Sequence, residues 1–401
     1  MLVKAGLLID FGNSESRVTL IAGQRAFRFN LSNRFALLPA GYNINNKYAN
    51  GKSTVFQADS AYYANGQIVE MEFSNVELRP SALQSKTEQL TTELTINLAI
   101  IKALTILSQV YHTAIDQIDA SFKVSALLPP LDHEVNEERL AEMFRKVESV
   151  SALIPYSIEN KVVKIEEEVG IYSEAVAAFF GAFYKEEGMN YNPENEGKSA
   201  ENGDILVFDN GKHVSLVEVE NNKKFEEGYV LVLDIGAGTT DVALFLNMEL
   251  IESSKDTFNR GGNTVSSLVF NEIRKKYGFA PPQKDMEKII KTGQLAEGSI
   301  SHDVSAIVTK AKNEYSSATT SDIRQYLERM AVALPVVKGL LVAGGGALPS
   351  MYEGKVVSPS MADVLVGYLK QLAPRIEALD TEGKNLRELN IDGLGTIHKY
   401  S

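Results

Sequence analysis

Cysteine is absent from the 401 residues of this chain, which excludes disulfide bridges, thiolate nucleophiles and cysteine-ligated metals. Only five histidines are present, none in an HExxH spacing, so a zinc hydrolase is not expected. Positive charge is scarce: 40 Lys and Arg face 52 Asp and Glu, and the net charge of −12 argues against direct nucleic-acid binding. Neither an apolar run of the ~20 residues that span a bilayer nor a signal-peptide layout is recognised, so we expect a cytoplasmic protein without membrane contact.

The remaining composition, 44% hydrophobic and 23% charged, is typical of a soluble globular protein with two or three domains or one large two-lobed unit. A polar stretch rich in Gly, Asn and Pro near the middle of the chain predicts a linker. We expect domain I over 1–185 with a small β-rich subdomain near 31–90, a linker or exposed insertion over 186–228, and domain II over 229–370 with a helical subdomain near 263–333. A C-terminal tail follows over 371–401, and its last 20 residues are polar and expected to be loosely held.

The most informative feature is a unit that occurs twice: an apolar strand, an Asp, a turn containing Gly, and a second strand. The first copy has Asp10 and Gly12, and the second has Asp234, Gly236 and Gly238. Gly lets backbone N–H groups approach phosphate closely, and Asp can hold Mg²⁺ directly or through water. A single Asp-x-Gly turn is more often only a turn, but two of them could clamp a polyphosphate from both sides.

A third glycine turn follows the apolar strand 339–343, and by itself it could be only a flexible joint between a strand and a helix. Together the motifs resemble the actin/DnaK-chaperone/sugar-kinase ATPase superfamily. The matching segments are 8–17 (LIDFGNSESR) and 233–241 (LDIGAGTTD) for the phosphate loops, 341–347 (LVAGGGA) for adenosine, and 172–178 (YSEAVAA) for the connecting helix. Among its members the ParM-type bacterial actins fit best, partly through 362–368 (ADVLVGY).

The resemblance implies an α/β, actin-like bilobed fold: two related mixed-sheet domains with a nucleotide cleft between them. It implies ATP, with GTP as an alternative, and Mg²⁺ as ligands. The nucleotide would be bound by Asp10, Gly12, Asn13, Ser14, Arg17, Asp234, Gly236, Gly238, Thr239, Thr240, Gly344, Gly345 and Gly346, and the metal by Asp10, Asp234 and Asp241. It also implies that residues 259–263 lead toward the ribose and that the helix carrying Lys310 and Lys312 borders the base.

Glu174 occupies the place of the acid that orients or deprotonates the attacking water in ParM-like actins. By itself it would rather be an acid interacting with a helix dipole, but beside the phosphate loops the catalytic role is favoured. Arg17 stands where actin has a phosphate-touching Lys, but an exposed strand residue is an equal reading. Asp241 could share the metal or cap its turn.

As function, the resemblance implies an ATPase that assembles head-to-tail into nucleotide-dependent filaments and segregates plasmid or other DNA through a DNA-binding adaptor protein. A chaperone-like ATPase would need a substrate domain, and too few residues follow Gly346 for one. A small-molecule kinase remains an alternative, although no sugar-binding signature lies beside Glu174. A membrane-tethered scaffold is disfavoured because the polar tail suggests no amphipathic helix.

Overall fold

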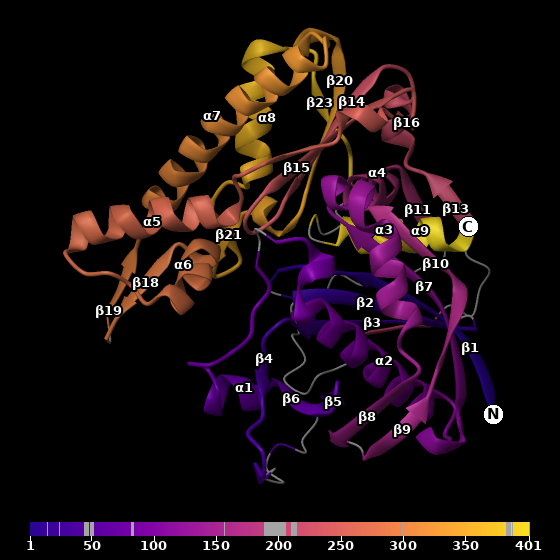
Figure 1. Ribbon diagram of the computed structural model, residues 1–401. Helices are drawn as coiled ribbons and strands as arrows, with labels where there is room; N and C mark the ends of the chain where they lie inside the picture. Colours follow the sequence, from indigo (N-terminus) through magenta and orange to yellow (C-terminus); the bar gives the residue numbers. More distant parts are fainter. Residues whose placement is uncertain are drawn as a thin grey trace. The chain divides into compact units, whose positions relative to one another are not determined.

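The chain folds as two units, each built around a mixed β-sheet (Figure 1). Unit 1 comprises Met1–Ser173, Lys185–Val217 and Leu394–Ser401, and unit 2 comprises Glu174–Tyr184 and Glu218–Gly393. The structure is a computed structural model that describes all residues except 14, 24, 44–47, 49–51, 82–83, 156, 188–205, 210–214, 299, 382–385, 387 and 401. Much of the predicted linker over 186–228 therefore lies outside the described residues.

The strands described in unit 1 form two large sheets. The strands are β1 (Leu2–Asp10), β2 (Glu15–Ala22), β3 (Arg25–Ser32), β4 (Phe35–Leu37), β5 (Ser53–Ala58), β6 (Ala61–Gly66), β7 (Asp119–Leu128), β8 (Ser149–Ile154), β9 (Ile158–Val162), β10 (Lys164–Ser173) and β12 (Leu206–Asp209). The helices are α1 (Gln67–Glu72), α2 (Leu90–Val110) and α3 (Pro130–Arg145). The first sheet has the order β10-β7-β1-β2-β3-β12, and the second has the order β4-β6-β5-β8-β9.

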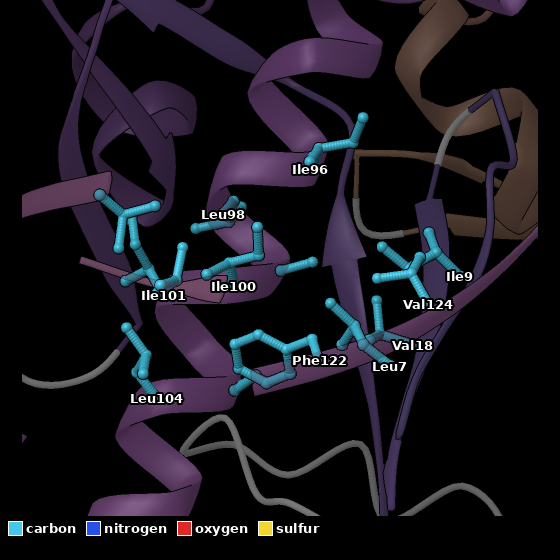
Figure 2. Close-up of a cluster of buried hydrophobic side chains, with 14 of the residues drawn as sticks. Leu7, Ile9, Val18, Ile96, Leu98, Ile100, Ile101, Leu104, Phe122 and Val124 are labelled. Carbon is cyan, nitrogen blue, oxygen red and sulfur yellow. The ribbon is translucent and has the colours of Figure 1, made fainter. Parts of the chain in front are cut away.

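The central strand β1 is apolar almost throughout because it lies inside the first sheet, parallel to β7 and antiparallel to β2. Helix α2 packs against β2 and β3 of the first sheet and against β5 and β8 of the second. Figure 2 shows part of this core, a cluster of buried side chains that includes Ile100 and Leu104 of α2 and Phe122 of β7. A helix that packs against two different sheets buries most of its surface and must therefore be apolar on nearly all sides.

This position of α2 corrects one expectation from the sequence. Leu90–Val110 is 21 residues long and apolar enough to cross a membrane, although no such run was expected. However, 78% of the 18-residue window that meets this test is buried inside the structure. The apolar surface of α2 is therefore used by the core of unit 1.

Unit 2 repeats the plan. Its strands include β14 (Tyr229–Ile235), β15 (Thr240–Leu246), β16 (Glu249–Leu250), β17 (Asp256–Phe258), β18 (Gln294–Glu297), β19 (Ile300–Asp303), β20 (Val337–Ala343), β21 (Ser350–Tyr352), β22 (Lys355–Ser358) and β23 (Glu377–Ala378). Its helices include α4 (Glu174–Phe183), α5 (Gly262–Tyr277), α6 (Met286–Thr292), α7 (Ser305–Arg329) and α8 (Met361–Leu372). The short strands β11 (Tyr184–Glu187) and β13 (Ser215–Glu218), where the chain passes between the units, form a separate two-stranded sheet.

The sheet of unit 2 has the order β16-β15-β14-β20-β23, so β14 corresponds to β1, β15 to β2 and β20 to β7. As in unit 1, the central strand is antiparallel to its hairpin partner and parallel to its other neighbour. Asp10 faces Arg17 across the first hairpin, and Asp234 faces Asp241 across the second. The predicted duplication of the strand–turn–strand unit is therefore confirmed at the level of topology.

The predicted C-terminal tail over 371–401, whose last 20 residues were expected to be loosely held, contains regular structure. It contains β23, which extends the sheet of unit 2, and a final helix α9 (Leu389–Tyr400). The residues of α9 up to Gly393 belong to unit 2 and those from Leu394 to unit 1. Buried residues of this helix include Leu389, Ile391 and Leu394, so burial accounts for its order.

Candidate functional site

The first predicted phosphate loop joins β1 to β2 in unit 1. Asp10 is the last residue of β1, is only 3% exposed, and forms an ion pair with Arg17, whose Nη1 lies 2.8 Å from the Asp10 Oδ2. A buried carboxylate is costly without a partner, and the guanidinium of Arg17 supplies one. Arg17 is thus not an exposed strand residue: it lies at the loop, beside the acid proposed for the metal.

The backbone of the first loop is held tightly. A Cβ on Gly12 would lie 2.2 Å from the carbonyl oxygen of Glu15, so only Gly fits there. The buried side chain of Asn33 donates from Nδ2 to the carbonyl of Gly12, and its Oδ1 accepts from the hydroxyl of Ser16 at 2.9 Å. Ser14, one of the predicted ligands, lies outside the described residues.

Lys86 contacts this loop and was missed by the sequence analysis. Its side chain is 8% exposed, and its Nζ donates to the Oδ1 of Asn13 at 2.8 Å. Its backbone N–H donates to Asp132 Oδ2 at 2.9 Å, which anchors the residue to α3. A lysine ammonium buried beside the predicted phosphate loop is a candidate ligand for phosphate. No local pattern identified it, because 73 residues separate it from Asn13.

The second predicted loop joins β14 to β15 in unit 2. Asp234 and Asp241 are each 5% exposed and face one another across the hairpin. Asp241 Oδ1 accepts from the hydroxyl of Thr257 at 2.6 Å, and Asp234 Oδ2 accepts from the amide nitrogen of Asn390 at 2.6 Å. Two buried carboxylates therefore lie at neighbouring positions of one hairpin, each oriented by a hydrogen bond.

The turn of the second loop is bound to the start of α5. The N–H of Gly236 donates to the carbonyl of Thr239 at 2.9 Å, which closes the turn. The Gly236 carbonyl accepts from the N–H of Gly262, also at 2.9 Å. A Cβ on Gly261 would lie 2.7 Å from the Gly236 oxygen, so this glycine permits the close approach. The segment 259–263, expected to lead toward the ribose, therefore packs directly on the loop.

The two threonines of this loop differ in what their side chains do. The hydroxyl of Thr240, which is fully buried, donates to the carbonyl of Arg260 at 2.7 Å and lies 2.6 Å from the Tyr315 hydroxyl. Burial, the largest influence, raises the pKa of Tyr315, so its O–H stays protonated. Thr240 thus supports the 259–263 segment, and among the two threonines Thr239 is the better candidate for direct contact with phosphate.

The glycine turn after β20 lies against the second loop, because β20 runs parallel to β14 with Ala343 in register with Asp234. Gly344 has φ of 92°, and a Cβ there would lie 2.2 Å from Asp234 Oδ1. A Cβ on Gly346 would lie 2.6 Å from Ile235 Cγ2. Gly344 is required both by its backbone conformation and by the space that Asp234 occupies.

Glu174, the predicted catalytic residue, is the first residue of α4 and is 9% exposed. Helix α4 packs on β14, β15 and β20, the strands that carry the loops of unit 2. Its Phe179 stacks on Phe245 of β15 with ring centroids 4.0 Å apart. Glu174, Asp234 and the 344–346 turn therefore all belong to unit 2 and to elements that contact one another.

The helix expected to border the base is α7, and its two lysines behave differently. Lys310 forms surface ion pairs with Glu272 and Glu314. Lys312 is 2% exposed and donates to Ser350 Oγ at 2.9 Å and to the carbonyl of Pro359 at 2.8 Å. Burial lowers the pKa of Lys312 to about 8. Its contacts hold the two ends of the β21–β22 hairpin, which follows the glycine turn.

The chemistry of these residues suits Mg²⁺ that is bound together with phosphate. The described residues contain no group of three or more His, Cys, Asp or Glu side chains arranged to hold a metal by themselves. Mg²⁺ in nucleotide sites usually takes one or two carboxylates, with phosphates and waters as its other ligands. Asp234, with its second oxygen oriented by Asn390, is a suitable carboxylate of this kind, and so is Asp10.

Comparisons with known proteins agree on one type of fold. Residues 232–351 match the family model described as "Archaeal actin homologue MreB-like, C-terminal". The cell shape-determining protein Mbl of Bacillus cereus is 26% identical over 146 residues, which are 31% of this chain. That match spans 43% of the length of Mbl.

Solved structures are similar over nearly the whole chain. Ta0583, an archaeal actin homologue, has a TM-score of 0.65 and 14% identity over 99% of both chains, and it has also been solved in complex with ADP. ParM of Bacillus thuringiensis, solved with ATP, has a TM-score of 0.58 and 14% identity over 100% of both chains. At these identities the similarity concerns the fold.

Proposed function

We propose, from the premise that this chain is an actin-like protein, that it binds ATP with Mg²⁺ and hydrolyses the nucleotide. The actin-like fold expected from the sequence is confirmed by the similarities above. The observation that carries the proposal is the duplicated hairpin, with a buried Asp and a glycine-permitted turn in each unit. Backbone N–H groups of such turns bind phosphate oxygens, and a nearby carboxylate is suited to the accompanying metal.

In this proposal the two hairpins and the third glycine turn bind different parts of the magnesium–nucleotide complex. Asp10 and Asp234, with Asp241, would hold Mg²⁺, which neutralises phosphate charge when bound. The turn glycines Gly12, Gly236 and Gly238 would keep the backbone close to phosphate. The other proposed phosphate-binding residues of the two loops are Asn13, Ser14, Arg17, Thr239 and Thr240, of which Thr240 has a supporting role. Gly344, Gly345 and Gly346, which match the adenosine motif in sequence, would lie at the adenosine end of the nucleotide, with Gly344 and Gly346 packed against the second loop.

Glu174 is the proposed catalytic residue. A mostly buried carboxylate at the start of α4 can accept a hydrogen bond from a water and orient it toward the terminal phosphate. It can also take the proton that this water loses as it attacks. Its membership of unit 2, together with the Asp234 loop, supports this role.

The hydrolysis proposal is tested with Glu174→Gln and Asp234→Asn in parallel. Glu174→Gln keeps the size and polarity of the side chain but cannot take a proton, so it should bind ATP normally and release phosphate at least ~100-fold more slowly. Asp234→Asn should weaken Mg²⁺-dependent ATP binding itself. Normal phosphate release by Glu174→Gln would remove Glu174 from its role, and the absence of ATP binding by the unaltered protein would overturn the proposal.

We further propose that ATP drives head-to-tail assembly of the chain into filaments in the cytoplasm, and that an adaptor protein links the filaments to plasmid or other DNA. The support is the ParM-like fold and the net charge of −12, which suits indirect rather than direct attachment to DNA. Sedimentation, light scattering and electron microscopy with ATP and Mg²⁺ test it. Filaments that disassemble as phosphate is released are expected, whereas a monomer whose ATP turnover is stimulated by sugars would indicate a kinase.

A further inference from the structure

Asn390, on the first turn of α9, contacts the proposed metal carboxylate of unit 2. The residue is 6% exposed, and its Nδ2 lies 2.6 Å from Asp234 Oδ2. The orientation of this amide follows from chemistry, because a carboxylate only accepts hydrogen bonds and the NH₂ group must face it. The amide oxygen, Oδ1, therefore points to the other side of the same planar group.

That oxygen is the unusual feature. Among the described residues, Asn390 Oδ1 is a buried acceptor without a hydrogen-bond partner. Buried polar atoms are nearly always paired, since an unpaired one loses its hydration without compensation. Another buried asparagine of unit 2, Asn222, is bonded at both ends: its Nδ2 donates to the carbonyl of Asp380 at 2.8 Å, and its Oδ1 accepts from the Asp380 N–H at 2.8 Å.

The surroundings of the Asp234 carboxylate are closely packed. Gly344 closes one side, since a Cβ there would lie 2.2 Å from Asp234 Oδ1. The Gly344 N–H donates at 2.9 Å to the carbonyl of Leu386, just before α9, which ties the glycine turn to the approach of the helix. The Asp234 carboxylate and the Asn390 amide oxygen are both hard oxygen acceptors, and the hydrogen bond from Asn390 Nδ2 links the two groups. A hydrated divalent cation presents water O–H donors to such a pair.

We propose that Asn390 is a positioning residue of the magnesium–nucleotide site, fixing Asp234 through its NH₂ group and accepting a hydrogen bond through Oδ1 from a water bound to Mg²⁺. The inference rests on the proposed function and adds to it a residue from the last helix of the chain. Side chains that orient a metal's carboxylate and its waters typically contribute 10–100-fold to metal affinity. Asn390 is suited to both tasks because it carries a donor and an acceptor on one rigid group.

The test measures metal binding rather than turnover. Mn²⁺ replaces Mg²⁺, and its binding to the ATP-loaded protein is followed by electron paramagnetic resonance; a fluorescent ATP analogue is titrated in parallel in EDTA. Asn390→Ala should weaken Mn²⁺ binding about 10-fold and leave nucleotide binding in EDTA unchanged. Asn222→Ala is the matched control: it removes a buried asparagine from the same unit, so its Tm should fall with Mn²⁺ affinity unchanged.

Asn390→Asp tests the same contact if the alanine variant fails to fold. It would place a second carboxylate against Asp234, and a divalent cation relieves such repulsion. Added Mg²⁺ should therefore raise the Tm of Asn390→Asp more than that of the unaltered protein. The inference fails, while the proposed function stands, if Asn390→Ala binds Mn²⁺ as tightly as the unaltered protein does. It also fails if Mg²⁺ raises the Tm of Asn390→Asp no more than that of the unaltered protein. If the unaltered protein forms no Mn²⁺–ATP complex, both fail.

Discussion

Replacing Gly393 with Ala is expected to disrupt the contact between α4 and α9 in unit 2. A Cβ on Gly393 would lie 1.7 Å from the carbonyl oxygen of Ala177, and one on Gly181 would lie 2.3 Å from the carbonyl oxygen of Leu389. The two helices therefore touch backbone to backbone, through a glycine on each. No rotamer change can relieve a clash of this kind, because the opposing atoms belong to the main chain.

The cost can be estimated from the displacement. Ordinary contact begins near 3.4 Å, so α9 would have to withdraw by about 1.7 Å from Ala177. Overpacking of this kind costs ~1–3 kcal/mol, with the upper end expected against backbone. The higher helix propensity of Ala offsets ~1 kcal/mol of this destabilisation. A net loss of ~2 kcal/mol should lower the Tm by ~4–8 °C.

The assay is thermal unfolding, with Gly367→Ala as the control. Gly367 lies inside α8, and a Cβ there would have nothing within 4 Å. That variant gains only the helix propensity of Ala, so its Tm should rise slightly. Gly393→Ala should also weaken Mn²⁺ binding, because the same displacement moves Asn390 away from Asp234. A Tm for Gly393→Ala equal to that of Gly367→Ala would refute the reasoning.

Three further predictions concern buried basic side chains. Burial lowers the pKa of Lys312 from 10.5 to about 8. Between these pH values the unfolded chain binds more protons than the folded protein, so the stability of the protein relative to Lys312→Met should rise with pH there, as measured by thermal unfolding. Burial lowers the pKa of His398 from 6.5 to about 4, so stability relative to His398→Gln should fall as the pH drops through that range. Lys86→Met removes the bond to Asn13 and should weaken binding of a fluorescent ATP analogue about 10-fold in titrations.

Features with a local sequence pattern were predictable. A strand, an Asp and a Gly turn occupy consecutive residues, so both hairpins and their duplication could be read from the sequence and are present at Asp10 and Asp234. The turn at Gly344 was predictable for the same reason, although its closeness to Asp234 comes from the pairing of β14 with β20. Local patterns thus predicted the loops, and strand pairing brought two of them together.

Contacts between distant segments could not be predicted. The pairing of Asn390 with Asp234 spans 156 residues, and that of Lys86 with Asn13 spans 73. Neither Asn390 nor Lys86 stands in a motif that marks it as a ligand. The sequence analysis also did not recognise that α2 is apolar enough to cross a membrane, because Thr and Asn residues interrupt its apolar run. Those residues are buried where α2 packs against two sheets.

The final helix shows why composition misled the interpretation of the last 20 residues, which were expected to be loosely held because they are polar. Helix α9 also contains Gly393 and Gly395, which lower its helix propensity. Propensity describes an isolated helix, however, and the position of Gly393 is decided by contact with α4, where any side chain would collide with the Ala177 carbonyl. The residue that weakens α9 by itself is the one that lets it reach α4, and this approach brings Asn390 to Asp234. In such a segment a glycine indicates close packing as readily as disorder.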